Sequence, residues 1–170
     1  MKVFIIAALS ADGFIGAGEA HRSFDWTSKE DKQLLVELSK EAGVIVMGSK
    51  TFNTFRIRRA PPGRRLIVYT RHPETVKGEG DIQTTHETPQ NLIERLRAEG
   101  CHGLAIEGGS SIYKLFLDSG IVDELYLTIE PVLFGNGAPL FSGPVSTQLT
   151  LLENRQLNDN TVLLHYRVNM

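Results

Sequence analysis

One carboxylate stands on a helix face that is otherwise apolar. Positions 31, 34, 35, 38 and 42 recur at the i, i+3, i+4, i+7 spacing of one side of an α-helix, and only Asp31 among them is polar. The spacing directs Asp31 toward the interior, where an ionised carboxylate without a partner costs several kcal/mol. Asp31 is therefore a candidate functional acid. An equally open alternative is that it stabilises the positive helix N-terminus from a partly hydrated position.

Glycines mark two junctions between a buried strand and a helix, at Gly48 and at Gly108-Gly109. In an open α/β sheet, ligands bind beyond the carboxyl ends of the strands. Glycine there lets the backbone approach a pyrophosphate closely, and the helix N-terminus supplies N–H donors. Neither junction has the G-x-G-x-x-G pattern, and no G-x-x-x-x-G-K-[ST] occurs. Each junction taken alone is also consistent with a purely structural turn.

Alternating strands and helices must position these groups. Apolar runs predict strands at 3–9, 44–47, 65–69, 81–85, 103–106 and 124–133. Helices are predicted from a Thr27–Glu30 capping box to Gly43, and at 51–55, 89–99 and 112–117. Two alternating runs, 148–157 and 161–168, flank an Asn/Asp turn and predict a hairpin. We expect a single α/β domain, residues 1–170, with a mixed, mainly parallel sheet.

The composition of the chain argues against several classes of partner and binding site. The 170 residues are 41% hydrophobic and 22% charged with a net charge of -2, so we expect no nucleic-acid or anionic-membrane partner. Cys101 is the only cysteine and no His-x-x-x-His occurs, so neither a disulfide nor a metal site is expected. The apolar N-terminus ends at Leu9, which favours a buried first strand over a signal peptide and predicts a cytoplasmic protein.

Six segments follow one another in an order that is typical of a known family. They are Ile5–Leu9 with Gly13–Gly16, Trp26 five residues before Asp31, Val46–Gly48 with Thr51-Phe52, Pro62–Arg64 with Leu66–Val68, Ile106–Tyr113, and Leu125–Thr128. Together they resemble dihydrofolate reductase and its relatives, the reductase domains of riboflavin biosynthesis, over nearly the whole chain. The resemblance implies a three-layer fold with about four helices, a C-terminal antiparallel hairpin, and NADPH as the cofactor.

The resemblance also assigns roles to particular residues. Asp31 would bind the 2-amino and N3 edge of a pterin, Thr128 would steady the same edge, and Arg64 would take the tail carboxylate of folate. The implied substrate-binding residues are Ile6, Ala8, Trp26, Leu35, Phe55, Arg64 and Thr128. The implied cofactor-binding residues are Ala8, Ile15, Gly48, Ser49, Lys50, Thr51, Thr70, Arg71, His72, Ile106, Gly108, Gly109, Ser110, Ser111, Ile112 and Tyr113. Lys50, Arg71 and His72 would hold the 2′-phosphate, unless they are ordinary surface charges.

Some residues depart from the dihydrofolate reductase pattern. Glu107 stands where those enzymes usually have glycine, and Ser49 where they usually have a basic residue. The segments 107–109 and 131–141 are more similar to the riboflavin branch, although the H-x-E and P-C-x-x-C of its deaminase partner are absent. The chain is expected to be a monomer or a homodimer, with segment 132–141 buried within the chain or in a dimer interface.

Three functions are compatible with a chain that combines features of dihydrofolate reductase and of the riboflavin branch. We expect NADPH-dependent reduction of 7,8-dihydrofolate to tetrahydrofolate, because Trp26, Asp31 and Arg64 each have a role in binding folate. The first alternative is a riboflavin-type 5-amino-6-(5-phosphoribosylamino)uracil reductase or a related orphan reductase. The second is an NADPH-binding module without catalysis.

Overall fold

The computed structural model describes residues 1–18 and 21–169. In chain order its elements are β1 (Lys2–Ser10), β2 (Phe14–Gly16), η1 (Ser23–Asp25), α1 (Lys29–Ala42), β3 (Val44–Gly48), α2 (Ser49–Thr54), β4 (Arg65–Tyr69), η2 (Pro73–Thr75), β5 (Ile82–Thr85), α3 (Pro89–Ala98), β6 (Gly103–Ile106), α4 (Ser110–Asp118), β7 (Glu124–Glu130), β8 (Ala138–Pro139), β9 (Gln148–Gln156) and β10 (Val162–Asn169).

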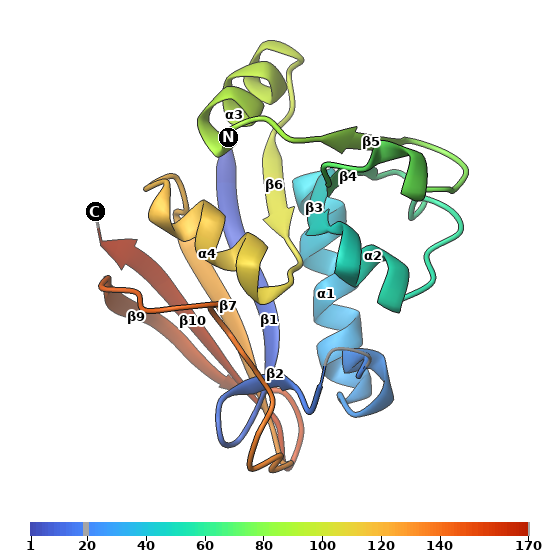
Figure 1. Ribbon diagram of the computed structural model, residues 1–170. Helices are drawn as coiled ribbons and strands as arrows, with labels where there is room; N and C mark the ends of the chain where they lie inside the picture. The colour runs from blue at the N-terminus through green and yellow to red at the C-terminus, as the bar shows by residue number, and fades with distance from the viewer. Residues whose placement is uncertain (19–20, 170) are drawn as a thin grey trace.

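Eight strands form one sheet in the order β5-β4-β3-β6-β1-β7-β10-β9 (Figure 1). The first six strands of this order are parallel, whereas β10 pairs antiparallel with both β7 and β9. The predicted mixed, mainly parallel sheet with a C-terminal hairpin is therefore confirmed. The β2 and β8 strands form a separate antiparallel pair.

Helices cover both faces of the sheet, which gives the three layers that the resemblance implied. Along β1, Val3 and Ile5 belong to the apolar cluster that includes residues of α3 and α4. Phe4 and Ile6 belong to the opposite cluster, with Leu34 of α1. This alternation follows from the two-residue period of a strand. Because helices cover both faces of the sheet, nearly every residue of β1 is apolar.

Helix α1 begins one residue later than the Thr27–Glu30 capping box predicts. The N-cap is Ser28, whose hydroxyl accepts a hydrogen bond from the Asp31 amide at 3.1 Å. The predicted start is wrong because a distant residue selects between two adjacent capping candidates: Glu130 accepts hydrogen bonds from the amide and the hydroxyl of Ser28. At the other end Gly43 has a φ of 75°, the left-handed C-cap that the sequence predicts.

The segments between elements hold structure that the sequence did not reveal. β2 lies in the segment 10–25 and pairs with β8, so these two loops are joined. They approach so closely that a Cβ on Gly137 would lie 2.2 Å from the carbonyl oxygen of Gly16. α4 begins two residues earlier than predicted, and β7 ends at Glu130 rather than at residue 133.

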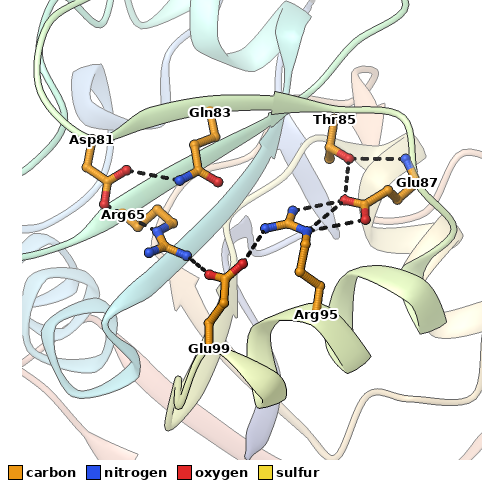
Figure 2. A network of polar contacts seen from close by, with 7 residues as sticks. All are labelled: Arg65, Asp81, Gln83, Thr85, Glu87, Arg95 and Glu99. Carbon is orange, nitrogen blue, oxygen red and sulfur yellow. Dashed lines mark hydrogen bonds and ion pairs between the residues drawn. The ribbon is translucent and has the colours of Figure 1, made fainter.

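A polar network joins the β4–β5 edge of the sheet to α3 (Figure 2). Arg65 of β4 donates to Asp81 and to Glu99. Arg95 of α3 donates to Glu99 at 3.1 Å and to Glu87 at 2.9 Å. The two arginines therefore share Glu99, and the network ties the edge strands to the helix that covers them.

Within residues 1–18 and 21–169, no helix has the length and the apolar character needed to cross a membrane.

Candidate active site

A cleft of about 1040 Å³ lies at the carboxyl ends of β1, β3 and β6. Its walls include residues of α1, α2 and the start of α4. They also include the segments 15–18 and 136–139, which contain most of the β2–β8 pair. This is the edge of a parallel sheet where ligands bind in α/β proteins. The cleft is large enough for a substrate and a cofactor side by side, since ordinary small-molecule pockets measure about 300–1,000 Å³.

Asp31 lies in the first turn of α1 and is 6% exposed, but it still contributes to the wall of the cleft. Thr128 of β7 donates a hydrogen bond to its Oδ1 at 2.5 Å. Burial raises the pKa of Asp31, and the hydrogen bond from Thr128 opposes that shift. Asp31 therefore combines a fixed orientation with a raised affinity for a proton.

Glu107 follows β6 and lines the same cleft. Among the described residues its Oε1 is buried and has no hydrogen-bond partner. Burial raises the pKa of this carboxyl to about 8, and the positive charge of Arg64 opposes the shift. Arg64 itself donates from Nη1 to Ser39 at 2.7 Å, while its buried Nε has no partner within the described part of the chain. A ligand with donor and acceptor groups could satisfy both side chains.

Three glycines let backbone segments meet at the cleft. The amide of Gly48 donates to the carbonyl of Gly108 at 2.8 Å, so the two glycine junctions are in contact. A Cβ on Gly48 would lie 3.0 Å from Ile112, and one on Gly109 would lie 3.2 Å from the hydroxyl of Thr51. Gly109 is the N-cap of α4 and supplies no side-chain cap, so the first amides of the helix can bind an anion.

Tyr113 closes the cleft from the side of α4. Its hydroxyl donates to the carbonyl oxygen of Ile6 at 2.8 Å. Burial raises its pKa, and the negative charges of Glu107 and Asp31 raise it further. Tyr113 therefore stays neutral and acts as a donor to β1.

Most of the predicted site residues meet in this cleft. They are Ile6, Ala8, Ile15, Asp31, Leu35, Gly48, Ser49, Lys50, Thr51, Phe55, Arg64, Gly108, Gly109, Ser110, Ser111, Ile112 and Tyr113. Their roles remain predictions, but residues from three helices and three strands converge around one volume.

Six predicted residues lie outside the lining of the cleft: Trp26, Thr70, Arg71, His72, Ile106 and Thr128. Thr128 lies behind Asp31 and contacts it directly. Ile106 is fully buried in the core. The Trp26 ring packs edge-on against Phe134, with 5.1 Å between ring centroids. Residues 70–72 follow β4, and the His72 ring lies 3.4 Å from a carboxylate oxygen of Glu74 rather than at the cleft.

The cleft also contains residues to which the sequence assigned no role. Glu107 stood out only as a departure from a pattern, and Ser39, Met47 and Phe24 gave no signal. Phe24 packs edge-on against Phe55, with 5.0 Å between ring centroids. Contacts between segments that are distant in the sequence cannot be predicted from local periodicity. Among the described residues, no three His, Cys, Asp or Glu side chains are grouped as metal ligands.

The fold and the cleft together define a dihydrofolate reductase-like architecture. The family model of the RibD C-terminal domain matches residues 1–163, so this chain belongs to the RibD C-terminal domain family. The uncharacterized protein YwjB of Bacillus subtilis is 24% identical over 172 residues, which cover 97% of both chains.

Two solved structures illustrate the breadth of the fold. A diaminohydroxyphosphoribosylaminopyrimidine deaminase/5-amino-6-(5-phosphoribosylamino)uracil reductase from Thermotoga maritima has a TM-score of 0.79 and 18% identity, covering 99% of this chain and 56% of that one. Dihydrofolate reductase from Enterococcus faecalis, in complex with NADP(H), has a TM-score of 0.72 and 24% identity, covering 99% and 97%. At these identities the two structures establish the fold alone.

Proposed function

We propose that this chain is an NADPH-dependent reductase whose substrate is an aminopyrimidine that carries a ribose phosphate. The observation that carries the proposal is Glu107. It is a buried carboxyl that lines the cleft together with Asp31 and Arg64, and it belongs to a chain of the RibD C-terminal domain family. This reading replaces dihydrofolate, which the sequence favoured, as the leading candidate.

The glycine junctions fit the proposed cofactor. At Gly48 and Gly109, where a Cβ would meet Ile112 or Thr51, the lack of a side chain would let a dinucleotide approach the backbone closely. Gly108, Gly109, Ser110 and Ser111 would hold the pyrophosphate at the start of α4. When bound, NADPH supplies the hydride.

The proposed reaction converts a ribosylamine into a ribitylamine. C1′ of the sugar gains a hydride, its bond to the ring oxygen breaks, and that oxygen gains a proton. Burial raises the pKa of Glu107 to about 8, so this carboxyl can hold the required proton near neutral pH, while Asp31, whose pKa burial also raises, lines the same cleft. Arg64 and Arg58 line the cleft, and their guanidinium groups have the charge and shape that match a phosphate.

Dihydrofolate is the second candidate because of the Asp31–Thr128 pair. A buried carboxylate supported by a hydroxyl can bind the amino edge of a pterin through two parallel hydrogen bonds. The apolar side chains of Leu35 and Phe55 line the cleft and could pack against its ring. An NADPH-binding module without catalysis is the third candidate.

A spectrophotometric assay of NADPH oxidation distinguishes the three candidate functions. We expect oxidation with 5-amino-6-(5-phosphoribosylamino)uracil and little with dihydrofolate. Activity confined to dihydrofolate would favour the second candidate. NADPH binding without oxidation by either compound would favour the third.

A further inference from the structure

Glu130, the last residue of β7, is a buried carboxylate whose hydrogen-bond partners within residues 1–18 and 21–169 are all neutral. It is 2% exposed. Its Oε1 accepts from the amide of Ser28 at 3.0 Å and from the hydroxyl of Ser28 at 2.9 Å, while its Oε2 accepts from the hydroxyl of Thr161 at 3.0 Å. A buried carboxylate needs such donors to offset the loss of hydration. No motif in the sequence points to Glu130.

These hydrogen bonds lead directly to Asp31. Ser28 is the N-cap of α1, and its hydroxyl oxygen accepts from the amide of Asp31 at 3.1 Å. A serine hydroxyl has one hydrogen, and Ser28 donates it to Glu130, so the lone pairs of its oxygen remain for the helix. Glu130 therefore fixes the orientation of the Ser28 hydroxyl, so that its oxygen accepts from the Asp31 amide.

The same strand also holds the side chain of Asp31. Thr128 and Glu130 are two residues apart on β7 and lie on one face of it, since side chains alternate along a strand. Thr128 donates to Oδ1 of Asp31, while Glu130 acts on its backbone through Ser28. β7 thus fixes Asp31 at two points.

We propose that Glu130 is a positioning residue for Asp31: it anchors the N-cap of α1 to β7 and so sets where the Asp31 carboxyl meets the substrate. The inference rests on the proposed function in that Asp31 is taken to act on the substrate. The anchoring of α1 follows from the geometry alone.

Glu130 also acts on Asp31 through its charge. Burial is the largest cause of the raised pKa of Asp31, and the negative charge of Glu130 raises it further. Lys32 of α1 opposes the shift, and Tyr113 of α4 interacts electrostatically with Asp31. A neutral residue at position 130 should therefore lower the pKa of Asp31.

The first test is the titration of Asp31 by carbon NMR of its carboxyl in the ligand-free protein. Glu130→Gln keeps the size of the side chain and an oxygen that can accept from Ser28, but it removes the charge. We expect the Asp31 midpoint to move to lower pH. Glu124→Gln is the matched control, because Glu124 lies at the other end of β7 in a pair with Lys2. An Asp31 midpoint that is the same in wild type and Glu130→Gln, or that moves equally in the control, overturns the charge interaction between Glu130 and Asp31.

The second test separates positioning from general stability. Glu130→Ala removes the anchor and should lower kcat about 100-fold, as small displacements of a catalytic group do, while the Kd for NADPH stays unchanged. Glu130→Gln should restore most of the loss. If Glu130→Ala does not fold, Ser28→Ala removes the connecting hydroxyl and should lower kcat in the same way. An unchanged kcat in the folded variants overturns the proposal. Inactive wild-type protein would contradict the proposed function, and the NMR titration would still decide the role of Glu130.

Discussion

Asp31 and Glu107 reach the cleft from different elements, and their surroundings give them different properties. Asp31 accepts a hydrogen bond from Thr128, which offsets part of the effect of burial. Glu107 has a buried oxygen without a partner in the described structure, and only the charge of Arg64 favours its ionised form. Two carboxyls held in unlike environments can divide the roles of proton donor and ionised carboxylate.

Replacing the Asp31 carboxyl should remove most of the activity. Asp31→Asn keeps the volume of the side chain but cannot accept or release a proton, so we expect kcat/KM to fall at least about 100-fold. Steady-state kinetics measure the effect, and circular dichroism checks the fold. Glu30→Gln is the control because Glu30 is the neighbouring carboxylate and bonds to Asn158 instead. Normal turnover in Asp31→Asn would contradict its role.

Glu107 should make stability depend on pH. Its pKa is about 8 in the folded protein against 4.5 for a free glutamate, so the native state binds more protons than the unfolded state between these values. The free energy of unfolding should therefore fall as pH rises from 4.5 to 8. Urea denaturation of Glu107→Gln should show a smaller fall over this range. The same pH dependence of the free energy of unfolding in wild type and Glu107→Gln would contradict a raised pKa of Glu107 in the folded protein.

Sequence reasoning identified Asp31 but not its partners at the helix cap. Helical periodicity places Asp31 on the buried face, and such local spacing is visible in the sequence. Glu130, which selects Ser28 as the cap, lies 102 positions away from it. That contact depends on the pairing of β7 with β1, and no local pattern encodes it.

At the scale of elements, the two glycine junctions bring α2 and α4 against the same cleft. Their contact, from the Gly48 amide to the Gly108 carbonyl, joins the ends of β3 and β6. Strand periodicity and glycine predicted both junctions, and β4 and β6 have the predicted bounds. The β2–β8 pair was not predicted, since its strands have three and two residues.

A side chain at the second junction should weaken cofactor binding. In Gly109→Ala the new Cβ would lie 3.2 Å from the Thr51 hydroxyl and would fill the approach to the start of α4. We expect the Kd for NADPH to rise about tenfold, measured by fluorescence titration. Gly143→Ala is the control, since its Cβ would meet only the flexible side chain of Lys114. Equal affinity in both variants would place the cofactor elsewhere.

At the scale of the whole molecule, the polar network in Figure 2 lies on the β4–β5 edge of the sheet. Arg95 joins Glu87 and Glu99, and Arg65 joins Glu99 to Asp81. None of these side chains lines the cleft. The network should therefore affect stability and leave the reaction unchanged.

Arg95→Ala should lower the free energy of unfolding by about 1 kcal/mol at neutral pH, the upper range for partly exposed ion pairs. Arg95 lowers the pKa of Glu87, so this stabilisation is present above the unfolded pKa of 4.5 and is lost as pH falls through the lower folded value. Urea denaturation at two pH values measures it, with Arg97→Ala on the same helix as the control. A difference that grows at acidic pH would contradict the assignment.

The choice between a folate and a ribose phosphate substrate is also argued at the scale of the whole molecule. Trp26, Asp31 and Arg64 each favoured folate in the sequence, but the Trp26 ring packs on Phe134 outside the cleft lining. The match to the RibD C-terminal domain family extends over residues 1–163 and shifts the proposal to a ribose phosphate substrate.

The transfer of deuterium from NADPH tests this proposal most directly. The protein would be supplied with 5-amino-6-(5-phosphoribosylamino)uracil and NADPH carrying deuterium at the transferred position of C4, and the product analysed by mass spectrometry and NMR. We predict one deuterium at C1′ of a ribityl product, formed by wild type and at least about 100-fold more slowly by Asp31→Asn. A product without deuterium at C1′, or deuterium transfer only to dihydrofolate, would contradict the proposal.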